Sequence, residues 1–219
     1  MIRFLFALSA FVFIGVFPVY AFGFNSNDLK IGEKLEFGAY YWIVLAIRDE
    51  GVLIISDRIV SRNSFEQTDE FSTWETSYIR HWLNDDFYNS FSPFDRSRIL
   101  ALEIANDDNI WFGTGAGQDT TDKIFLLSIE EALQYLGGGV RGDIVDEYTG
   151  LVGIWDERSC ERIAHYTDGE ARWWWLRSPG QHDNFSANVS PNGTVNIQGV
   201  TVTNRGGGVR PALWLRLSP

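Results

Sequence analysis

Apolar and β-branched residues form several short runs that are separated by polar or glycine-containing breaks. The runs Leu35–Ile47 and Val52–Ser56 flank the turn-like segment Arg48–Gly51, so we predict a β-hairpin there. Two further runs, Ile99–Ala105 and Lys123–Leu127, have the length and composition of single strands. These four runs predict short strands in the first part of the chain.

The last part of the chain predicts a second hairpin. Phe185–Val189 and Thr194–Ile197 alternate between apolar and polar positions around Asn192-Gly193, a dipeptide that favours tight hairpin turns. A final apolar run follows at Gly208–Leu217. Pro211 interrupts this run, and because proline cannot donate to the hydrogen bonds of a sheet, we predict an edge strand or a bulge.

Three serines mark the starts of predicted helices. Ser72 precedes a polar and acidic first turn, and Ser92 precedes a proline, which favours the first position of a helix. Ser128 and Glu131 have the spacing of a capping box. The helix that they begin is expected to end at about Leu136, before three glycines. Short antiparallel strands with two or three helices between them predict a fold of the α+β class.

Residues 22–219 are predicted to form one globular domain. Hydrophobic residues make up 45% of the sequence and aromatic residues 15%, which is far from the composition of a disordered chain. We find no repeat or linker that divides this region. The segment Val140–Glu170 is rich in glycine and charge, so we expect a long surface loop there.

Residues 1–21 have the pattern of a secretory signal peptide. Arg3 supplies a positive charge, Phe4–Val19 is almost wholly apolar, and Val19-Tyr20-Ala21 suits a signal peptidase. An uncleaved membrane anchor is the alternative, but the apolar run of about 16 residues is shorter than the ~20 that span a bilayer. We expect cleavage, no membrane insertion of the mature chain, and a secreted, periplasmic or cell-surface protein.

Charge and cysteine content exclude several classes of function. The sequence has 18 Lys and Arg and 29 Asp and Glu, so the chain without Arg3 has a net charge near −12 (18 − 1 − 29). This acidity disfavours nucleic acid and anionic membrane surfaces as partners. Cys160 is the single cysteine, which excludes an intramolecular disulfide and zinc sites that need several cysteines.

The segment Arg172–Gly180 reads RWWWLRSPG and contains three consecutive tryptophans. Strand alternation places Trp173 and Trp175 on one face and Trp174 on the other. If one face of the sheet is covered, one set is buried and the other is free to stack on a sugar or peptide. Trp174 is the tryptophan that we name as a candidate ligand contact.

Arg177 and Arg210 follow apolar residues in two well-marked segments. A buried arginine is seldom left without a partner. One interpretation is a structural pair with a carboxylate, for which the candidates are Asp57, Glu75 and Asp122. The other is a pocket in which the planar guanidinium binds an anion or carboxylate of a ligand.

Several segments resemble, in the same order, motifs of a bacterial family catalogued as domain of unknown function 6273. They are Phe37–Ile47, Leu53–Val60, Thr73–Phe91, Asp122–Tyr135, Trp174–Gly180 and Gly208–Leu215. The resemblance implies a secreted or surface-associated bacterial domain without an assigned activity. The tryptophan strand, the hairpin and Gly208-Val209-Arg210 also resemble, more loosely, C-type-lectin-like domains, including those of formylglycine-generating enzymes. The chemistry of those enzymes needs cysteines in motifs that are absent here, so we do not carry it over.

Calcium is the metal that this looser resemblance implies, because C-type-lectin-like folds sometimes bind it through acidic loops. The candidate ligands are Asp107, Asp108, Asp119 and Asp122. Solvated turns without a metal are the alternative interpretation. His182 and Asp183 lie in a similar polar segment, and we include both in the candidate ligand surface.

Three functions follow as hypotheses. The first is a non-enzymatic binding module whose ligand is a glycan, a cell-wall fragment or a protein. The second is an extracellular hydrolase that uses carboxylates or His81 as acid and base, although the sequence contains neither an HExxH motif nor a GxSxG motif. The third is a structural component of the cell envelope.

Overall fold

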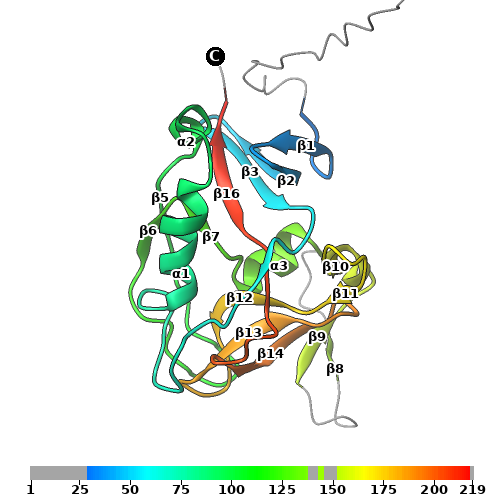
Figure 1. The fold of residues 1–219 in the computed structure, drawn as a ribbon. Helices are drawn as coiled ribbons and strands as arrows, with labels where there is room; N and C mark the ends of the chain where they lie inside the picture. The colour runs from blue at the N-terminus through cyan, green and yellow to red at the C-terminus, as the bar shows by residue number, and fades with distance from the viewer. Residues whose placement is uncertain (1–28, 138–142, 146–151, 218–219) are drawn as a thin grey trace, which may run out of the picture.

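The computed structural model of the protein describes residues 29–137, 143–145 and 152–217. The predicted signal peptide at residues 1–21 lies outside these ranges. Parts of the predicted surface loop, residues 140–142 and 146–151, also lie outside them. The described residues form two main sheets with short helices beside and between them (Figure 1). This arrangement confirms the α+β class.

Five strands form the first sheet, in the upper part of Figure 1. Their spatial order is β1 (Lys34–Phe37), β2 (Tyr40–Arg48), β3 (Gly51–Ser56), β16 (Ala212–Arg216) and β7 (Ile124–Phe125). All neighbours are antiparallel, and β2 and β3 form the first predicted hairpin. The last strand of the chain therefore lies inside the sheet, between β3 and β7.

The position of β16 shows that the predicted edge strand around Pro211 is wrong. Pro211 lies between β15 (Gly208–Val209) and β16, at the point where the chain passes from one sheet to the other. Its carbonyl accepts a hydrogen bond from the backbone N–H of Ser56 at 2.9 Å. Proline is tolerated here because the position needs an acceptor and no N–H donor.

Seven strands form the second sheet, in the lower part of Figure 1. Their order is β4 (Ser61–Arg62), β15, β12 (Trp174–Pro179), β13 (Phe185–Val189), β14 (Val195–Thr201), β9 (Gly153–Trp155) and β8 (Asp143–Val145). β12 and β15 are parallel, and the other pairs are antiparallel. The predicted hairpin of β13 and β14 is confirmed, with Gly193 at φ 85° in its turn.

The helices are α1 (Tyr78–Trp82), the π-helix η2 (Leu83–Phe87), α2 (Pro93–Arg98), α3 (Ile129–Tyr135) and the 3₁₀-helix η3 (Ser159–Arg162). The predicted starts at Ser92 and at the capping box of Ser128 and Glu131 are confirmed. The predicted start at Ser72 is wrong, because the segment from Thr73 first forms hydrogen-bonded turns. Ser77 caps α1 instead, and its hydroxyl accepts from the Arg80 N–H at 3.3 Å.

Two small sheets complete the described part of the chain. They are β5 (Leu102–Ile104) with β6 (Thr120–Asp122), and β10 (Ala164–His165) with β11 (Ala171–Arg172). The segment that we predicted as a long surface loop thus contains β8, β9, η3 and β10. Ile154 and Arg162 are fully buried in it. A segment rich in glycine and charge does not show the apolar pattern that predicts buried elements. Arg162 is buried here because hydrogen bonds satisfy its guanidinium.

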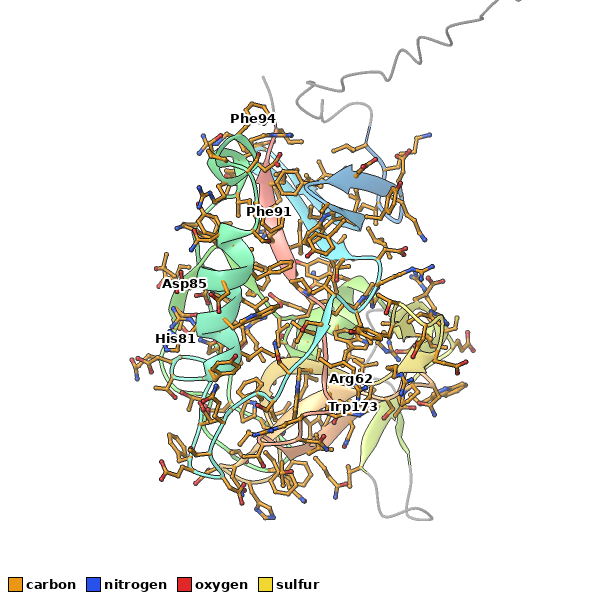
Figure 2. All side chains as sticks on the ribbon, viewed as in Figure 1. Arg62, His81, Asp85, Phe91, Phe94 and Trp173 are labelled. Carbon is orange, nitrogen blue, oxygen red and sulfur yellow. The ribbon has the colours of Figure 1, made fainter. Side chains whose placement is uncertain are left out.

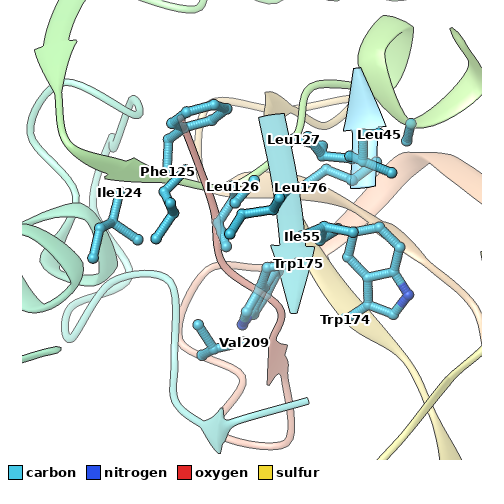
Figure 3. Packing of buried hydrophobic residues seen from close by; sticks show 14 of the residues in the cluster. Leu45, Ile55, Ile124, Phe125, Leu126, Leu127, Trp174, Trp175, Leu176 and Val209 are labelled. Carbon is cyan, nitrogen blue, oxygen red and sulfur yellow. The ribbon is translucent and has the colours of Figure 1, made fainter. Parts of the chain in front are cut away.

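One buried cluster joins the two sheets. Figure 3 shows Ile55 of β3, Val209 of β15 and Trp175 of β12 in this cluster. α3 packs on β12 and β14. Each large apolar side chain that is fully buried stabilises the folded state by about 1.5–3 kcal/mol, because it is removed from water. The core therefore fixes β12 and β15, and with them the segments that flank these strands at the surface.

Candidate functional site

The three tryptophans take different positions. Trp174 is fully buried, and its indole N–H donates to the Arg162 carbonyl at 3.0 Å. Trp175 is also buried. Trp173 is half-buried, and its ring makes an edge-to-face contact with Trp175 at 4.7 Å between centroids. Both faces of β12 are buried, so the predicted free face is wrong. The tryptophan that reaches the surface is Trp173, which precedes the strand.

Arg177 is a structural residue in the interior. Its guanidinium forms an ion pair with Glu131 and donates to the carbonyls of Leu126 at 2.8 Å and Ala105 at 3.0 Å. It also reaches the Asn106 side chain at 3.2 Å. Its side chain is only 4% exposed. The carboxylate partner is Glu131, which was not among the predicted candidates, and the guanidinium joins three chain segments rather than a ligand.

Arg210 is fully buried as well. Its Nε donates to the Ser56 carbonyl at 2.9 Å, and its guanidinium lies 5.1 Å from the centre of the Trp174 ring. Nη1 has no hydrogen-bond partner among the described residues. Loss of hydration lowers the pKa of Arg210 to about 10, although the charge of Asp57 opposes this shift. The structure buries this residue, so it does not form an open ligand pocket.

The candidate calcium ligands are not gathered around one point. Asp122 is buried and accepts from Trp74 Nε1 at 2.8 Å, Arg80 Nε at 2.7 Å and Thr120 Oγ1 at 2.7 Å. Asp108 and Asp119 accept backbone N–H groups within their own loop. In residues 29–137, 143–145 and 152–217, no group of three or more His, Cys, Asp or Glu side chains could hold a metal ion. Asp108 and Asp119 thus stabilise their own loop, and Asp122 joins β6 to Trp74 and Arg80.

His182 and Asp183 lie exposed in the turn between β12 and β13. The His182 ring contacts the Phe185 ring edge-on at 5.4 Å. The Asp183 carbonyl accepts from the Ser72 N–H at 3.2 Å. Both residues therefore belong to a surface turn, outside the cleft described next.

A polar cleft lies at the β4 edge of the second sheet. It has a volume of about 390 Å³ and is lined by Arg62, Asn63, Ser64, Gln67, Tyr78 and Arg205. A Cβ at Gly206 would lie 3.7 Å from both Arg62 Nη2 and the Trp173 ring, so these two side chains converge beside it. Figure 2 shows Arg62 and Trp173 close together. We name this feature the Arg62–Arg205 cleft.

The backbone around the cleft is held tightly. The Asn63 carbonyl accepts from Trp175 Nε1 at 2.8 Å, and the Asn63 N–H donates to the Gly207 carbonyl at 3.0 Å. A side chain at Gly207 would overlap the Trp175 ring, so only glycine fits. Gly208 pairs with Arg62 in the sheet. The glycine run thus lets β4 and β15 approach the tryptophan strand and places both arginines at the surface.

The charge of the cleft is opposite to that of the chain. The whole sequence carries a net charge of −11, but the cleft lining contains two arginines and no acidic residue. Both arginines are exposed. Within the described part of the chain, neither has an Asp or Glu oxygen within 4.0 Å. Two arginines in the lining of one cleft, without a carboxylate partner among the described residues, create a local positive field that favours an anion.

The family comparison agrees with the motifs. A family model described as "Domain of unknown function (DUF6273)" matches residues 49–217. The chain belongs to this family. The search of curated proteins gave no match, and the search of solved structures gave none. Among the described residues of this DUF6273 domain, no helix is long and apolar enough to cross a membrane.

A second hollow of about 300 Å³ lies beside the π-helix of the DUF6273 domain. Arg80, Asn84 and Asp122 line it and are joined by hydrogen bonds. His81 and Asp85 lie exposed at its rim, where Figure 2 labels them. Lys123 also lines it, and its ammonium lies 4.2 Å from the centre of the Tyr88 ring. Its cations are thus engaged by neighbours, whereas those of the Arg62–Arg205 cleft have no carboxylate partner in the part of the chain that the structure describes.

Arg62, Arg205 and Trp173 were not among the predicted site residues. Arg62 stands in a two-residue strand and Arg205 in a glycine-rich connection. Neither segment has a pattern of its own, and only pairing of β4 with β15 brings them together. The one available signal was the glycine run at 206–208, which indicates close approach of another backbone or ring.

Proposed function

We propose that the mature chain is a secreted, non-enzymatic bacterial binding module, and that its ligand is a glycan fragment that carries a carboxylate group. The observation that carries the proposal is the presence of two arginines without carboxylate partners, among the described residues, in one polar cleft. The cleft volume of about 390 Å³ lies in the range of small-molecule sites.

A carboxylate suits this pair of arginines better than other anions of low charge. The guanidinium is planar and presents parallel N–H donors, which match the two oxygens of a carboxylate. Arg62 and Arg205 can supply such a fork from two sides, since they come from different segments of the cleft wall. Charge-assisted hydrogen bonds of this kind contribute about 1.5–3 kcal/mol each.

The remaining lining fits the body of a sugar. Asn63, Ser64 and Gln67 offer amide and hydroxyl groups for the hydroxyls of a ligand. Tyr78 and the adjacent Trp173 are half-buried rings that can stack on the apolar face of a pyranose. The lining contains no Asp, Glu, His or Cys, so it lacks the acid–base pair that glycoside hydrolysis uses. This composition supports binding over hydrolysis.

Two wider features belong to the same proposal. Export rests on the leader-like pattern of residues 1–21, and sequencing of the mature N-terminus tests it; a protein that begins at Met1 contradicts it. A C-type-lectin-like architecture rests on the motifs and on the pairing of β3 with β16, which joins segments from the two halves of the chain. An experimental structure, compared with that fold, tests the likeness.

The ligand is tested by calorimetry and thermal unfolding with matched oligosaccharides. Oligogalacturonate supplies the carboxylate, and a neutral oligogalactose of equal length is the control. At about 100 times its dissociation constant, a ligand adds ~2.7 kcal/mol, which raises Tm by roughly 5–11 °C for a domain of this size. We expect the acidic sugar alone to raise Tm. Arg62→Gln with Arg205→Gln should abolish the shift, and Arg216→Gln, at an exposed arginine elsewhere, should leave it unchanged.

Other outcomes would redirect the assignment. Equal shifts with both sugars, or shifts that survive the double substitution, would exclude the Arg62–Arg205 cleft as a carboxylate site. Release of reducing ends from the oligosaccharides would favour the hydrolase. No shift with any sugar, together with a stable complex recovered from the envelope, would favour the structural envelope component.

A further inference from the structure

A rigid turn projects apolar side chains from the connection between β5 and β6. Asn109 and Thr114 form an isolated bridge, and the Asn109 carbonyl accepts the N–H groups of Phe112 at 3.2 Å and Gly113 at 2.7 Å. Gly113 has φ 70°, which a residue with a side chain adopts only at a cost. Residues 110–112 at the tip read Ile-Trp-Phe. We name them the 110–112 tip.

A buried amide fixes the tip to the second sheet. Asn109 is 1% exposed, and its Nδ2 donates to the carbonyls of Pro179 and Ile197, each at 2.9 Å. Its Oδ1 accepts from the Trp111 N–H at 3.1 Å. Trp111 itself is half-buried and packs against the core cluster. The hydrogen bonds of Asn109 therefore attach the turn to the second sheet, and the turn keeps its shape without a ligand.

The two other residues of the tip face the solvent. Ile110 is 62% exposed and Phe112 is 38% exposed. Phe71, in a neighbouring segment, is 63% exposed. Burying one such side chain in a contact contributes about 1.5–3 kcal/mol. Ile110 and Phe112 stand two positions apart on one rigid turn, and exposed apolar side chains that gather in this way mark surfaces that contact a partner.

The chain segments at this end of the molecule are acidic. The Ser72 N–H donates to the Asp183 carbonyl at 3.2 Å, and Asn184 Nδ2 donates to Asp69 at 3.0 Å. The segments 66–75 and 180–185 are therefore in contact. They lie at the same end of the molecule as Asn109, which bonds to Pro179. Residues 63–79, 100–121 and 178–198 contain no lysine or arginine. The exposed acids of this end are Asp69, Glu70, Asp107, Asp108, Asp119 and Asp183.

We infer that the 110–112 tip docks on another protein, at an apolar surface that is rimmed by lysine or arginine side chains. The charge of this end selects the partner: unlike charges across an interface speed association and suppress wrong partners. The same charge opposes an anionic membrane, which attracts basic rather than acidic surfaces. A protruding tip also differs from the concave sites that small ligands use.

The inference stands apart from the proposed function. The Arg62–Arg205 cleft contains none of the residues of the 110–112 tip. Sugar binding at the cleft and protein docking at the tip therefore succeed or fail separately. A domain with both would hold a glycan at one place and a protein at another.

The experiment uses a defined probe of the inferred chemistry. An amphipathic helical peptide of leucine and lysine presents an apolar stripe rimmed by ammonium groups, and a leucine–glutamate peptide of the same pattern is its control. We expect calorimetry to detect the lysine peptide only. The double variant Ile110→Ser and Phe112→Ser should weaken that binding at least tenfold. Phe94→Ser, at a phenylalanine of α2 that is 63% exposed, is the matched control and should not change it.

A second variant tests the charge. Asp107→Asn with Asp183→Asn removes two charges and keeps the shape of both side chains, so binding of the lysine peptide should weaken severalfold and depend less on salt. Unchanged Tm in each variant shows that the fold is intact. Failure of the lysine peptide to bind, equal binding of both peptides, or binding that survives Ile110→Ser and Phe112→Ser overturns the inference. Binding of the tip to phosphatidylglycerol vesicles would overturn it too.

Discussion

The indole nitrogen of Trp175 occupies the space that a side chain at Gly207 would fill. The same nitrogen donates to the Asn63 carbonyl, and the Gly207 carbonyl accepts from the Asn63 N–H. The tryptophans at 173–175 and the glycines at 206–208 thus pack against each other, through Trp175 and Gly207. This contact fixes the position of Asn63, which follows Arg62 in the chain. The position of the cleft therefore depends on packing in the core.

Gly207→Ala should destabilise the protein strongly. The added Cβ would overlap the Trp175 ring, which is fully buried and has no room to move, and such overpacking costs about 1–3 kcal/mol. We expect urea unfolding to show a loss near the upper end of this range. Gly206→Ala is the matched control, because its nearest neighbour would be the end of the exposed Asn204 side chain at 3.1 Å. Equal losses for both variants would contradict the packing explanation.

Asp122→Ala should unfold at much lower denaturant concentration than the wild type. The substitution leaves Trp74 Nε1, Arg80 Nε and Thr120 Oγ1 without their acceptor in a buried place. Removing one member of a buried ion pair costs about 3–5 kcal/mol. Asp107→Ala, at an exposed carboxylate, should change stability by less than about 0.5 kcal/mol. If a chelator lowered the Tm of the wild type but not that of Asp122→Ala, Asp122 would be a metal ligand after all.

Arg210→Met should be more stable than Arg210→Lys by about 1–3 kcal/mol, because methionine removes the buried charge whereas lysine retains it. Burial lowers the folded-state pKa of Arg210 from its usual value to about 10. This shift corresponds to a penalty on the order of 3 kcal/mol while the guanidinium is charged. Chemical denaturation of the two variants at pH 7 provides the comparison. A more stable lysine variant would show that the charge itself stabilises the fold.

The same pKa gives the wild type a dependence on pH that Arg210→Met lacks. Below about pH 10 the guanidinium is charged in both the folded and the unfolded chain, so the penalty is complete. Above pH 10 the folded state releases its proton first, and the unfolded state binds more protons. The wild type should therefore gain about 1 kcal/mol relative to Arg210→Met by pH 11. A constant difference from pH 7 to pH 11 would refute this.

Trp173→Ala should weaken binding of the acidic oligosaccharide about tenfold, which is ~1.4 kcal/mol, because the ring lies at the cleft beside Arg62. Trp155 is 49% exposed in β9 and lies outside the cleft lining, so Trp155→Ala is the control. Titration calorimetry at low salt measures both. A loss of the same size in the two variants would indicate a general effect of removing tryptophan.

Local rules predicted the elements whose determinants lie close together in the chain. The capping box of Ser128 and Glu131 and the turn at Gly193 each depend on a few neighbouring residues, and both form as expected. The first helix was placed too early because Ser72 and Ser77 both have the chemistry of a cap. The burial of Trp74 decides between them, and a local pattern does not contain that information.

Local sequence rules could not predict which carboxylates the arginines contact. Arg177 meets Glu131 because β12 passes beside the start of α3. Arg62 lies in an edge strand and meets no carboxylate of residues 29–137, 143–145 and 152–217. The alternation of the tryptophans predicted the shared face of Trp173 and Trp175, which their ring contact confirms. It did not indicate that all six residues of β12 are buried, on both faces. That burial depends on segments that are far away along the chain.

The central place of β16 has a consequence for the order of events during synthesis. Leu213 and Trp214 pair with Ile54 and Leu53, about 160 positions earlier. The first hairpin leaves the ribosome long before the strand that completes its sheet. Until then, one edge of β3 and the apolar face around it have no cover, and contacts this far apart form slowly. Such a chain stays open to chaperones for most of its synthesis, and its first sheet is complete only when β16 has been made.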